Sequence, residues 1–260
     1  MDGPASTNLI FEVLSWNING LKSKFWDCLG LMRLAGFPKI ICLQETHSSH
    51  DLSLLWGSNL GDYYCYFSHG STASRGVAIF VHRSLDFQII QEICDTQGRY
   101  IILKGFLCGM QMTIGSIYAP SDTSKNRELF FDEVLGLNLG NIHYLFGDFN
   151  SVLDNTLDRP NGSFGGDNEL INFCKDTFSV EAWRIKNPTK IEYSYARHVE
   201  NGPFSRIDLC LVSSEADRTI VDANYINSFR ISDHKCLLVK VQAGVKIVGY
   251  DFQKNKAKRY

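Results

Sequence analysis

The chain is predicted to fold as a layered α/β domain, because short apolar segments with strand patterns alternate with helix-like segments. A second observation concerns function. Several of the apolar segments end in polar side chains, while almost nothing polar interrupts them. In layered α/β folds, ligands bind where strand ends meet loops. The polar residues at these strand ends are therefore the candidate site.

Composition limits the possible classes of protein. The 260 residues are 44% hydrophobic and 21% charged, which is ordinary for a globular enzyme. The net charge of −2 excludes a chain-wide basic surface, so any phosphate-binding surface must be local. We expect a flexible N-terminus over residues 1–8, a single domain over 9–242, and a basic tail or linker over 243–260.

The cysteines indicate an intracellular, reducing compartment. All eight are scattered without a C-x-x-C pair, which argues against both a disulfide framework and a zinc site. No signal-peptide segment opens the sequence, and no apolar run reaches the length that spans a membrane. We therefore expect no membrane association.

The first part of the chain predicts a strand, a helix and a second strand. Alternation over 10–16 predicts the first strand, and the segment 25–35, ended by glycine and proline, predicts the helix. The segment 40–43 is wholly apolar, as in strands buried on both faces. The polar residues that follow these two strands are Asn17, Asn19 and Glu45.

The middle of the chain predicts a sheet followed by a helix over 124–135. Tyr118 and Ser121 follow the last strand of this group. The predicted strands cover 76–81, 87–93, 100–107 and 110–117.

The central prediction concerns the strand that begins at Tyr144 and runs into Gly147. Side chains alternate across a strand, so Asp148 and Asn150 share one face while Phe149 points to the other. Burying such a pair without partners costs about 1–3 kcal/mol each, which favours a functional role. The alternative is that both side chains cap the next turn.

The last third predicts a helix over 167–178 and a hairpin. Strands over 192–197 and 204–212 flank an Asn-Gly turn, which is a strong hairpin signal. The final strand covers 235–241.

We expect the polar strand ends to converge on one site. Carboxylates about 4 Å apart repel by roughly 4 kcal/mol per pair at an effective dielectric constant near 20, so their clustering implies a cation. Oxygen ligands without cysteine favour Mg²⁺, with Mn²⁺ as a possible substitute, and the natural substrate is a phosphate ester. The candidate catalytic residues are Asn17, Glu45, Tyr118, Asp148, Asn150, Asp208, Asp233 and His234.

Six short motifs in order resemble those of the exonuclease–endonuclease–phosphatase superfamily, over residues 11–242. They are 15–21 (SWNINGL), 44–47 (QETH), 118–120 (YAP), 147–150 (GDFN), 205–208 (SRID) and 232–234 (SDH). Four further segments are similar to the apurinic-type endonuclease domain of LINE (non-LTR) retrotransposons. These are 75–79 (RGVAI), 98–101 (GRYI), 156–159 (TLDR) and 192–195 (EYSY).

The resemblance implies a four-layer α/β sandwich, with two packed mixed sheets flanked by helices. It also implies Mg²⁺-dependent nicking of one strand of double-stranded DNA, leaving a 3′-hydroxyl that primes reverse transcription. The expected partners are DNA and a reverse transcriptase region of the same polyprotein, acting in the nucleus. The isolated domain is expected to be a monomer.

Residue roles follow from the same resemblance. Glu45 would be the principal metal ligand, with Asn17 and Asp233 as further ligands. Asp148 would orient or deprotonate the attacking water, and Asn150 would hold the scissile phosphate. The remaining roles are an Asp208–His234 pair that keeps the imidazole charged and a hydroxyl donor, Tyr118.

DNA contacts are expected around this site. The segment 196–204 corresponds to the hairpin with which the family reaches into the minor groove. Relatives often carry asparagine where this chain has Ser121, a shorter donor. The expected DNA-binding residues are Asn19, Ser121, Arg159, Arg197, His198, Asn201, Ser205, Arg206 and Ile207.

Two alternatives remain open at this point. One is another enzyme of the superfamily, either an abasic-site repair endonuclease or a phosphatase of inositol phosphates or sphingomyelin. The other is an inactive DNA-binding module, whose mark would be a missing ligand. Five histidines have no motif and are expected to be surface or packing residues: His47, His50, His69, His82 and His143.

Overall fold

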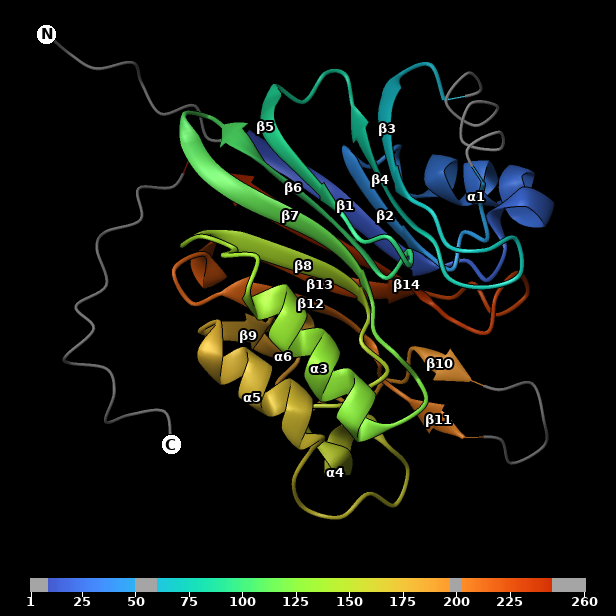
Figure 1. Cartoon of the computed structure of the whole chain (residues 1–260), viewed down its shortest axis with the longest axis vertical. Coiled ribbons are helices and arrows are strands. Elements are labelled where there is room, and N and C mark those ends of the chain that lie inside the picture. Colours follow the sequence, from blue (N-terminus) through green and yellow to red (C-terminus); the bar gives the residue numbers. More distant parts are fainter. Residues whose placement is uncertain (1–8, 50–59, 197–202, 245–260) are drawn as a thin grey trace, which may run out of the picture.

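The computed structural model describes residues 9–49, 60–196 and 203–244, and within them two six-stranded sheets pack face to face (Figure 1). Helices lie on the outer face of each sheet. The predicted four-layer α/β sandwich is therefore confirmed.

The first sheet has the strand order β13-β14-β1-β2-β4-β3. The parallel pair β1–β2 lies at its centre, and its other pairs are antiparallel. Its strands are β1 (Leu9–Asn17), β2 (Ile40–Gln44), β3 (Tyr63–Ser68), β4 (Val77–His82), β13 (Ile220–Ile226) and β14 (Cys236–Ala243).

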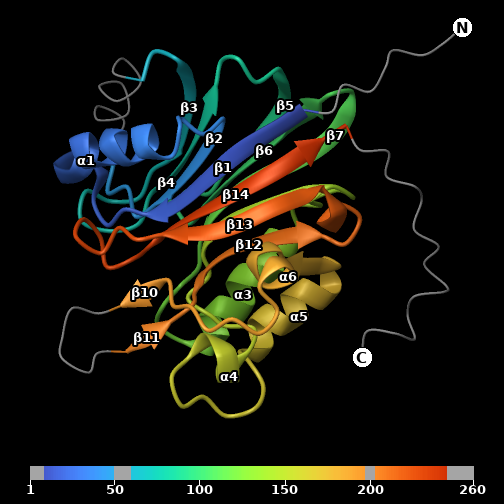
Figure 2. The same ribbon diagram turned by 180° about the vertical axis from the view of Figure 1, so that it is seen from behind.

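The second sheet has the order β5-β6-β7-β8-β12-β9, with one parallel pair, β7–β8. A separate two-stranded ribbon, β10–β11, lies beside the sandwich (Figure 2). The strands are β5 (Phe87–Cys94), β6 (Tyr100–Leu107), β7 (Met110–Tyr118), β8 (His143–Asp148), β9 (Ser179–Glu181), β12 (Asp208–Ser213), β10 (Tyr195–Ala196) and β11 (Phe204–Ser205).

Helix α1 (Leu21–Leu34) covers the first sheet, and its inward residues pack on the outer side of β1 and β2. Helices α3 (Ser124–Leu135) and α5 (Asn168–Asp176) cover the second sheet. Thr123 begins α3 by accepting a hydrogen bond from the Asn126 N–H, which satisfies a free amide of the first turn. The shorter helices are α4 (Asn155–Asp158), α6 (Ala182–Lys186) and the 3₁₀ turn Asp217–Thr219.

The main core lies between the two sheets. Alternate residues of each strand enter it, such as Val13 on β1, Cys42 on β2 and Phe146 on β8. The residues between them face the helices, so central strands such as β2 and β8 are buried on both sides, as the wholly apolar segment 40–43 predicted. All eight cysteines are free, which agrees with the absence of a disulfide framework.

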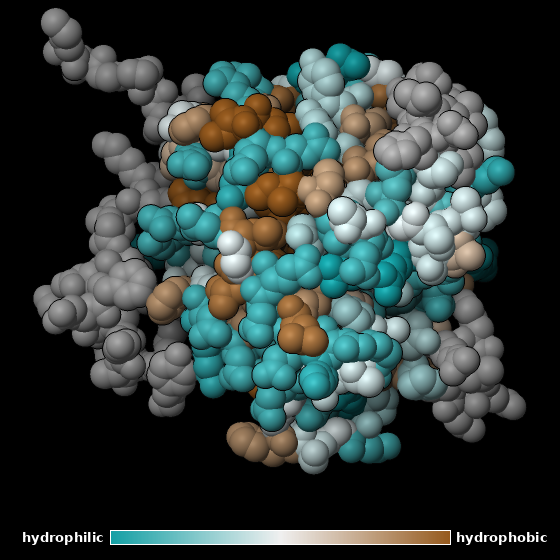
Figure 3. Space-filling model, viewed as in Figure 1, coloured by the Kyte–Doolittle hydropathy of each residue, from teal (hydrophilic) through white to brown (hydrophobic). Residues whose placement is uncertain are grey.

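The helices cover only part of the second sheet. Figure 3 shows hydrophobic side chains gathered over β5–β7, where Ile90 is 60% and Phe106 is 38% exposed. None of the helices in the described part of the chain has the length and apolarity that a membrane-spanning helix needs.

Several predicted boundaries were wrong. Helix α1 begins at Leu21, four residues before the predicted start, and β3 and β13 were not predicted. The predicted strand 204–212 is two strands, because β11 belongs to the ribbon and β12 to the second sheet. Only Tyr195–Ala196 of the segment 192–197 is a strand among the described residues. Three segments lie outside the described residues: 1–8, expected to be a flexible N-terminus, 197–202, expected to be the hairpin tip, and 245–260.

Candidate active site

The site forms at the strand ends, where the side chains on the inner face of each sheet change from apolar to polar. On β8, Tyr144 and Phe146 face the other sheet, and Asp148 continues the same side. Asp148 is paired in register with Tyr118 of β7 on one side and Asp208 of β12 on the other. Three candidate side chains are thus neighbours on one sheet edge.

Gly147 lets β8 reach this edge. Its φ of 152° and its surroundings both require glycine, since an added Cβ would lie 1.9 Å from the Ile117 carbonyl oxygen. Asn150 then takes a φ of 47°, donates its N–H to Asp148 Oδ1 at 2.9 Å and its Nδ2 to the Ala119 carbonyl at 2.8 Å. Phe149 is buried on the helix side, opposite to Asp148, as the alternation predicted, whereas Asn150 lies beyond the end of β8.

Asn17 connects the two sheets. Its Nδ2 donates to Glu45 Oε1 at 2.9 Å and to Asp148 Oδ2 at 3.0 Å. Its Oδ1 accepts from the Asn19 N–H at 3.1 Å. The fully buried amide therefore fixes two carboxylates that come from different sheets.

Asp208 and His234 form a buried pair. His234 Nδ1 lies 2.9 Å and 3.1 Å from the two Asp208 carboxylate oxygens, and Nε2 lies 3.8 Å from Asp148 Oδ2. The Ser194 hydroxyl holds the start of β12 by accepting from the N–H groups of Ile207 and Asp208. Burial disfavours the imidazolium, but the charge and hydrogen bond of Asp208, with Asp148, raise the pKa of His234 to about 9.

The other titratable groups are shifted by the same surroundings. Burial, opposed by His234 and assisted by Asp208, raises the pKa of Asp148 to about 7. Burial and the charges of Glu45 and Asp148 raise the pKa of Tyr118, so its hydroxyl stays protonated. The site thus holds a protonated imidazole, a phenol donor and a carboxylate that can exchange a proton near neutral pH.

The outer edge of the site is exposed. Asn19 Nδ2 donates to Asp233 Oδ1 at 3.4 Å, and Asp233 also accepts from the Ser232 hydroxyl. Asp233 stands next to His234, but its carboxylate faces the solvent-accessible side near Asn19.

The donor set suits a divalent cation. Among the described residues, one ligand atom each of Asp148, Asp208 and His234 lie within 4.8 Å of one another. Glu45 joins this group through Asn17. The carboxylate oxygens, without a thiolate, suit Mg²⁺ or Mn²⁺, whereas the imidazole could ligate an ion only in its neutral form. The predicted ligand Asn17 instead directs its amide nitrogen toward Glu45 and Asp148, so here it acts as a donor that positions both.

Two of the expected DNA contacts need correction. The Arg206 side chain is fully buried, donating from Nε to Asp158 Oδ1 at 2.8 Å and from an Nη to Glu181 Oε2 at 2.7 Å. Ile207 is only 7% exposed. Neither side chain can reach a DNA backbone, because the segment that contains them is clamped between α4 and β9.

The remaining predicted DNA-contact residues that are described lie at the surface. Asn19 and Ser121 are exposed and Ser205 is half-buried. Arg159 is half-buried and donates to Asp167 and Asn155. Arg197, His198 and Asn201 lie outside the described residues. The ribbon that would carry them stands beside the site, since Tyr195 bridges to His234.

His47 is the residue that sequence reasoning missed. It was expected to be a surface or packing residue, but its Nε2 lies 3.2 Å from Glu45 Oε2. The spacing could have revealed it, because His47 follows Glu45 by two residues, as Asn150 follows Asp148.

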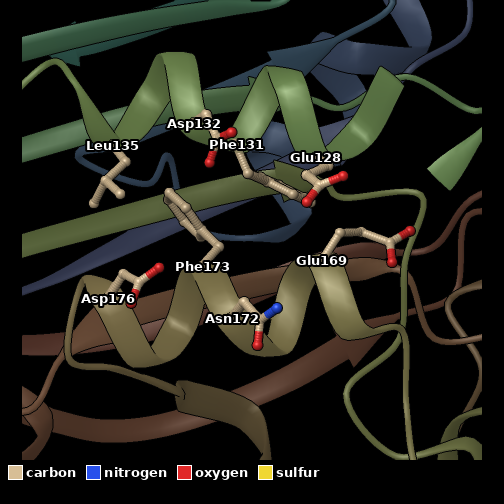
Figure 4. Close-up of a pocket in the computed structure, with 8 residues that line it drawn as sticks. All are labelled: Glu128, Phe131, Asp132, Leu135, Glu169, Asn172, Phe173 and Asp176. Carbon is tan, nitrogen blue, oxygen red and sulfur yellow. The ribbon is translucent and has the colours of Figure 1, made fainter. Parts of the chain in front are cut away.

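Away from this site, a hollow of ≈ 230 Å³ lies between α3 and α5 (Figure 4). Phe131 and Phe173 face each other there, surrounded by four carboxylates. An acidic lining repels phosphate, so this hollow does not compete with the strand-end site as a place for a phosphate ester. The four carboxylates belong to Glu128, Asp132, Glu169 and Asp176.

Comparisons with known proteins concern the sequence family and the fold. Residues 14–234 match the sequence model described as the Endonuclease/Exonuclease/phosphatase family. The structure resembles the AP endonuclease LMAP from Leishmania major, with a TM-score of 0.74 and 17% identity over 90% of this chain and 88% of that one.

Two further solved structures are similar. The catalytic domain of Xenopus laevis APE2 has a TM-score of 0.75 and 19% identity, covering 89% of this chain and 93% of that one. The 3′ phosphatase NExo from Neisseria, bound to a product DNA hairpin, has a TM-score of 0.72 and 18% identity, covering 89% and 99%. At these identities the likeness concerns the fold.

Proposed function

The chain belongs to the endonuclease/exonuclease/phosphatase family, and from this membership we propose that it is a Mg²⁺-dependent endonuclease that nicks one strand of duplex DNA. The observation that carries the proposal is the buried Asp208–His234 pair facing Asp148 at the strand ends. No expected catalytic residue is missing, which argues against an inactive DNA-binding module.

The metal would be held by the carboxylates of this site. Glu45 would be the principal ligand, with Asp233 as a further predicted ligand, while Asn17 would orient Glu45 by donating from Nδ2. A bound Mg²⁺ would supply positive charge to the phosphate oxygens as the phosphodiester breaks.

Asp148 is proposed to take a proton from the attacking water. Its pKa of about 7 is matched to a general base that works near neutral pH. Asn17 and the Asn150 backbone N–H each occupy one of its oxygens, which fixes the carboxylate without protonating it. Asn150 itself would hold the scissile phosphate.

His234 and Tyr118 are proposed to donate hydrogen bonds to the phosphate. With a pKa of about 9, the imidazole of His234 is charged at neutral pH, and Asp208 holds Nδ1 so that Nε2 faces the site. The Tyr118 hydroxyl supplies a neutral donor beside it. Such preorganised donors stabilise the charge that develops in the transition state.

The finer assignment rests on the four segments similar to LINE endonuclease domains. We propose that the nick leaves a 3′-hydroxyl that primes reverse transcription, and that the chain acts in the nucleus beside a reverse transcriptase region of the same polyprotein. Double-stranded DNA would be its substrate. The relatives described as an AP endonuclease and a 3′ phosphatase make abasic-site cleavage and phosphatase activity the competing outcomes.

Supercoiled plasmid with Mg²⁺ tests this proposal. Wild type should convert it to open circles, whereas His234→Ala should not, and the distant His82→Ala should behave like wild type. Circular dichroism confirms that the variants are folded. Intact plasmid with wild type, together with cleavage of an abasic duplex, would assign the chain to abasic repair instead.

A further inference from the structure

The segment from Glu45 to His47 is held in an unusual backbone conformation. Glu45 has a φ of 50° and His47 a φ of 49°, both in the left-handed region that side chains rarely adopt. Such strain persists only where the surroundings fix it, and it concentrates at functional sites.

Loops on both sides provide this support. The carbonyls of Glu45 and Thr46 accept from the N–H groups of Gly20 and Leu21 at 2.8 Å and 3.1 Å. In the other direction, the N–H groups of Thr46 and His47 donate to the carbonyls of Gly76 and Arg75 at 2.9 Å and 3.0 Å. The short segment is therefore hydrogen-bonded to the chain before α1 and to the chain before β4.

Gly76 shows how close this packing is. It has a φ of 88°, and an added Cβ would lie 2.5 Å from Thr46 Oγ1. That hydroxyl is itself engaged with Ser48 Oγ at 2.9 Å. With the backbone and Thr46 fixed in this way, Glu45 and His47 are turned toward each other.

The Glu45 carboxylate is contacted by Asn17, by His47 and by the Tyr118 hydroxyl, which is hydrogen-bonded to it. Oε1 accepts from Asn17 Nδ2 at 2.9 Å, and Oε2 lies 3.2 Å from His47 Nε2. Both side chains are mostly buried, at 21% exposure for Glu45 and 18% for His47. A carboxylate offers about four lone-pair positions, so these contacts orient the group and still leave a position for a cation.

We propose that His47 is a positioning residue that holds the Glu45 carboxylate in the orientation required to bind the divalent cation. The inference rests on the proposed function and adds one residue, His47, to the same site. The hydrogen bond needs a proton on Nε2, which both the charged ring and one neutral tautomer provide. Partners of this kind, behind a ligand, change metal affinity about 10- to 100-fold.

The test is Mg²⁺ binding in the absence of DNA, measured by calorimetric titration of the intact chain. His47→Ala should weaken the affinity about tenfold, because Glu45 Oε2 loses its donor. His47→Gln can still reach Glu45 with an amide N–H, so most of the affinity should return, whereas the shorter His47→Asn should resemble alanine. His82→Ala, a histidine that contacts Ser84 at the far end of β4, is the matched control.

The unfolding temperature in EDTA separates positioning from general stability. The inference predicts that His47→Gln and His47→Asn unfold at the same temperature without metal and differ when Mg²⁺ is added. Equal Mg²⁺ affinity in all the variants would overturn it, and so would an Asn variant that binds as well as the Gln variant.

Plasmid nicking in the same buffers distinguishes the two proposals. A wild type that does not nick, but whose Mg²⁺ affinity depends on His47, would reject the nuclease and keep the positioning role. If the wild type nicks and the His47 variants bind Mg²⁺ as tightly as it does, the nuclease is kept and the positioning role is rejected.

Discussion

Single residues at the strand ends supply the chemistry, and the Asp208–His234 pair is the clearest case. Asp208 is 1% exposed, so its carboxylate interacts with the imidazole with little screening by water. The pair was predicted from the order of short motifs. The buried position of Asp208 follows from the register of β12 against β8, in which it faces Asp148.

Replacing Asp208 with asparagine should therefore impair nicking while the fold is retained. Asparagine keeps the size of the side chain but removes the negative charge that favours imidazolium at His234. We expect the nicking rate to fall about 100-fold or more, within the range for loss of a positioned acid or base. Single-turnover rates on an intact DNA duplex measure the nicking step. The exposed Asp222→Asn is the control. A rate within threefold of wild type, about 0.65 kcal/mol, would contradict the role.

Other residues could be predicted only in part. The alternation of side chains along a strand was sufficient to predict the position of Asp148. The same two-residue spacing, counted from Glu45, would have identified His47. The prediction that Arg206 contacts DNA was wrong. Its ion-pair partners Asp158 and Glu181 lie 48 and 25 residues away in the sequence, so the local pattern does not reveal them. A basic residue beside the site was interpreted as a DNA contact when it is the centre of a buried ion-pair network.

At the scale of elements, β8 is the strand on which the site depends. It pairs with β7 on one side and β12 on the other, and it ends at Asp148. Most strands and helix α3 were predicted near their boundaries, because alternation, glycine and proline are local signals. β3 and β13 were missed, and the division of 204–212 between two sheets depends on contacts that local patterns do not contain.

Gly147→Ala tests the dependence of the site on β8. The added methyl would lie 1.9 Å from the Ile117 carbonyl oxygen, so the β7–β8 pairing must shift. We expect a loss of about 3 kcal/mol or more in the free energy of unfolding, because both strain and a broken sheet contact contribute. Urea denaturation measures the change.

Gly30→Ala is the matched control for this prediction. Gly30 lies within α1, and an added Cβ has nothing within 4 Å. Alanine there should stabilise by about 0.5–1 kcal/mol through helix propensity. If both variants lost similar stability, the close approach at Gly147 would not be the cause.

At the scale of the whole molecule, two sheets from distant parts of the chain meet to form one site. In the first sheet, β1 and β2 supply Asn17 and lead into Glu45, and the segment before β14 carries Asp233 and His234. In the second sheet, β7, β8 and β12 supply Tyr118, Asp148 and Asp208. The layered class was predicted from alternating segments, and the four-layer arrangement from the resemblance. Strand order could not be derived from local patterns, since β1 pairs with β14 at the opposite end of the chain.

The whole-molecule charge also bears on DNA binding. With a net charge of −2, affinity must come from a local surface around the site, and binding should weaken steeply with salt. Two of the proposed contacts lie at the rim of the proposed site, since Asn19 donates to Asp233 and Ser205 pairs with Tyr195, which bridges to His234.

The most direct test of the central claim is the chemistry of the nicked end. Intact supercoiled plasmid is treated with the protein and Mg²⁺, and the nicks are then extended with a DNA polymerase and labelled nucleotides, without any phosphatase. We expect immediate extension, because the proposed hydrolysis breaks the bond between phosphorus and O3′, which leaves a 3′-hydroxyl and a 5′-phosphate. Nicks that extend only after a 3′ phosphatase treatment, or a plasmid that stays closed, would contradict it.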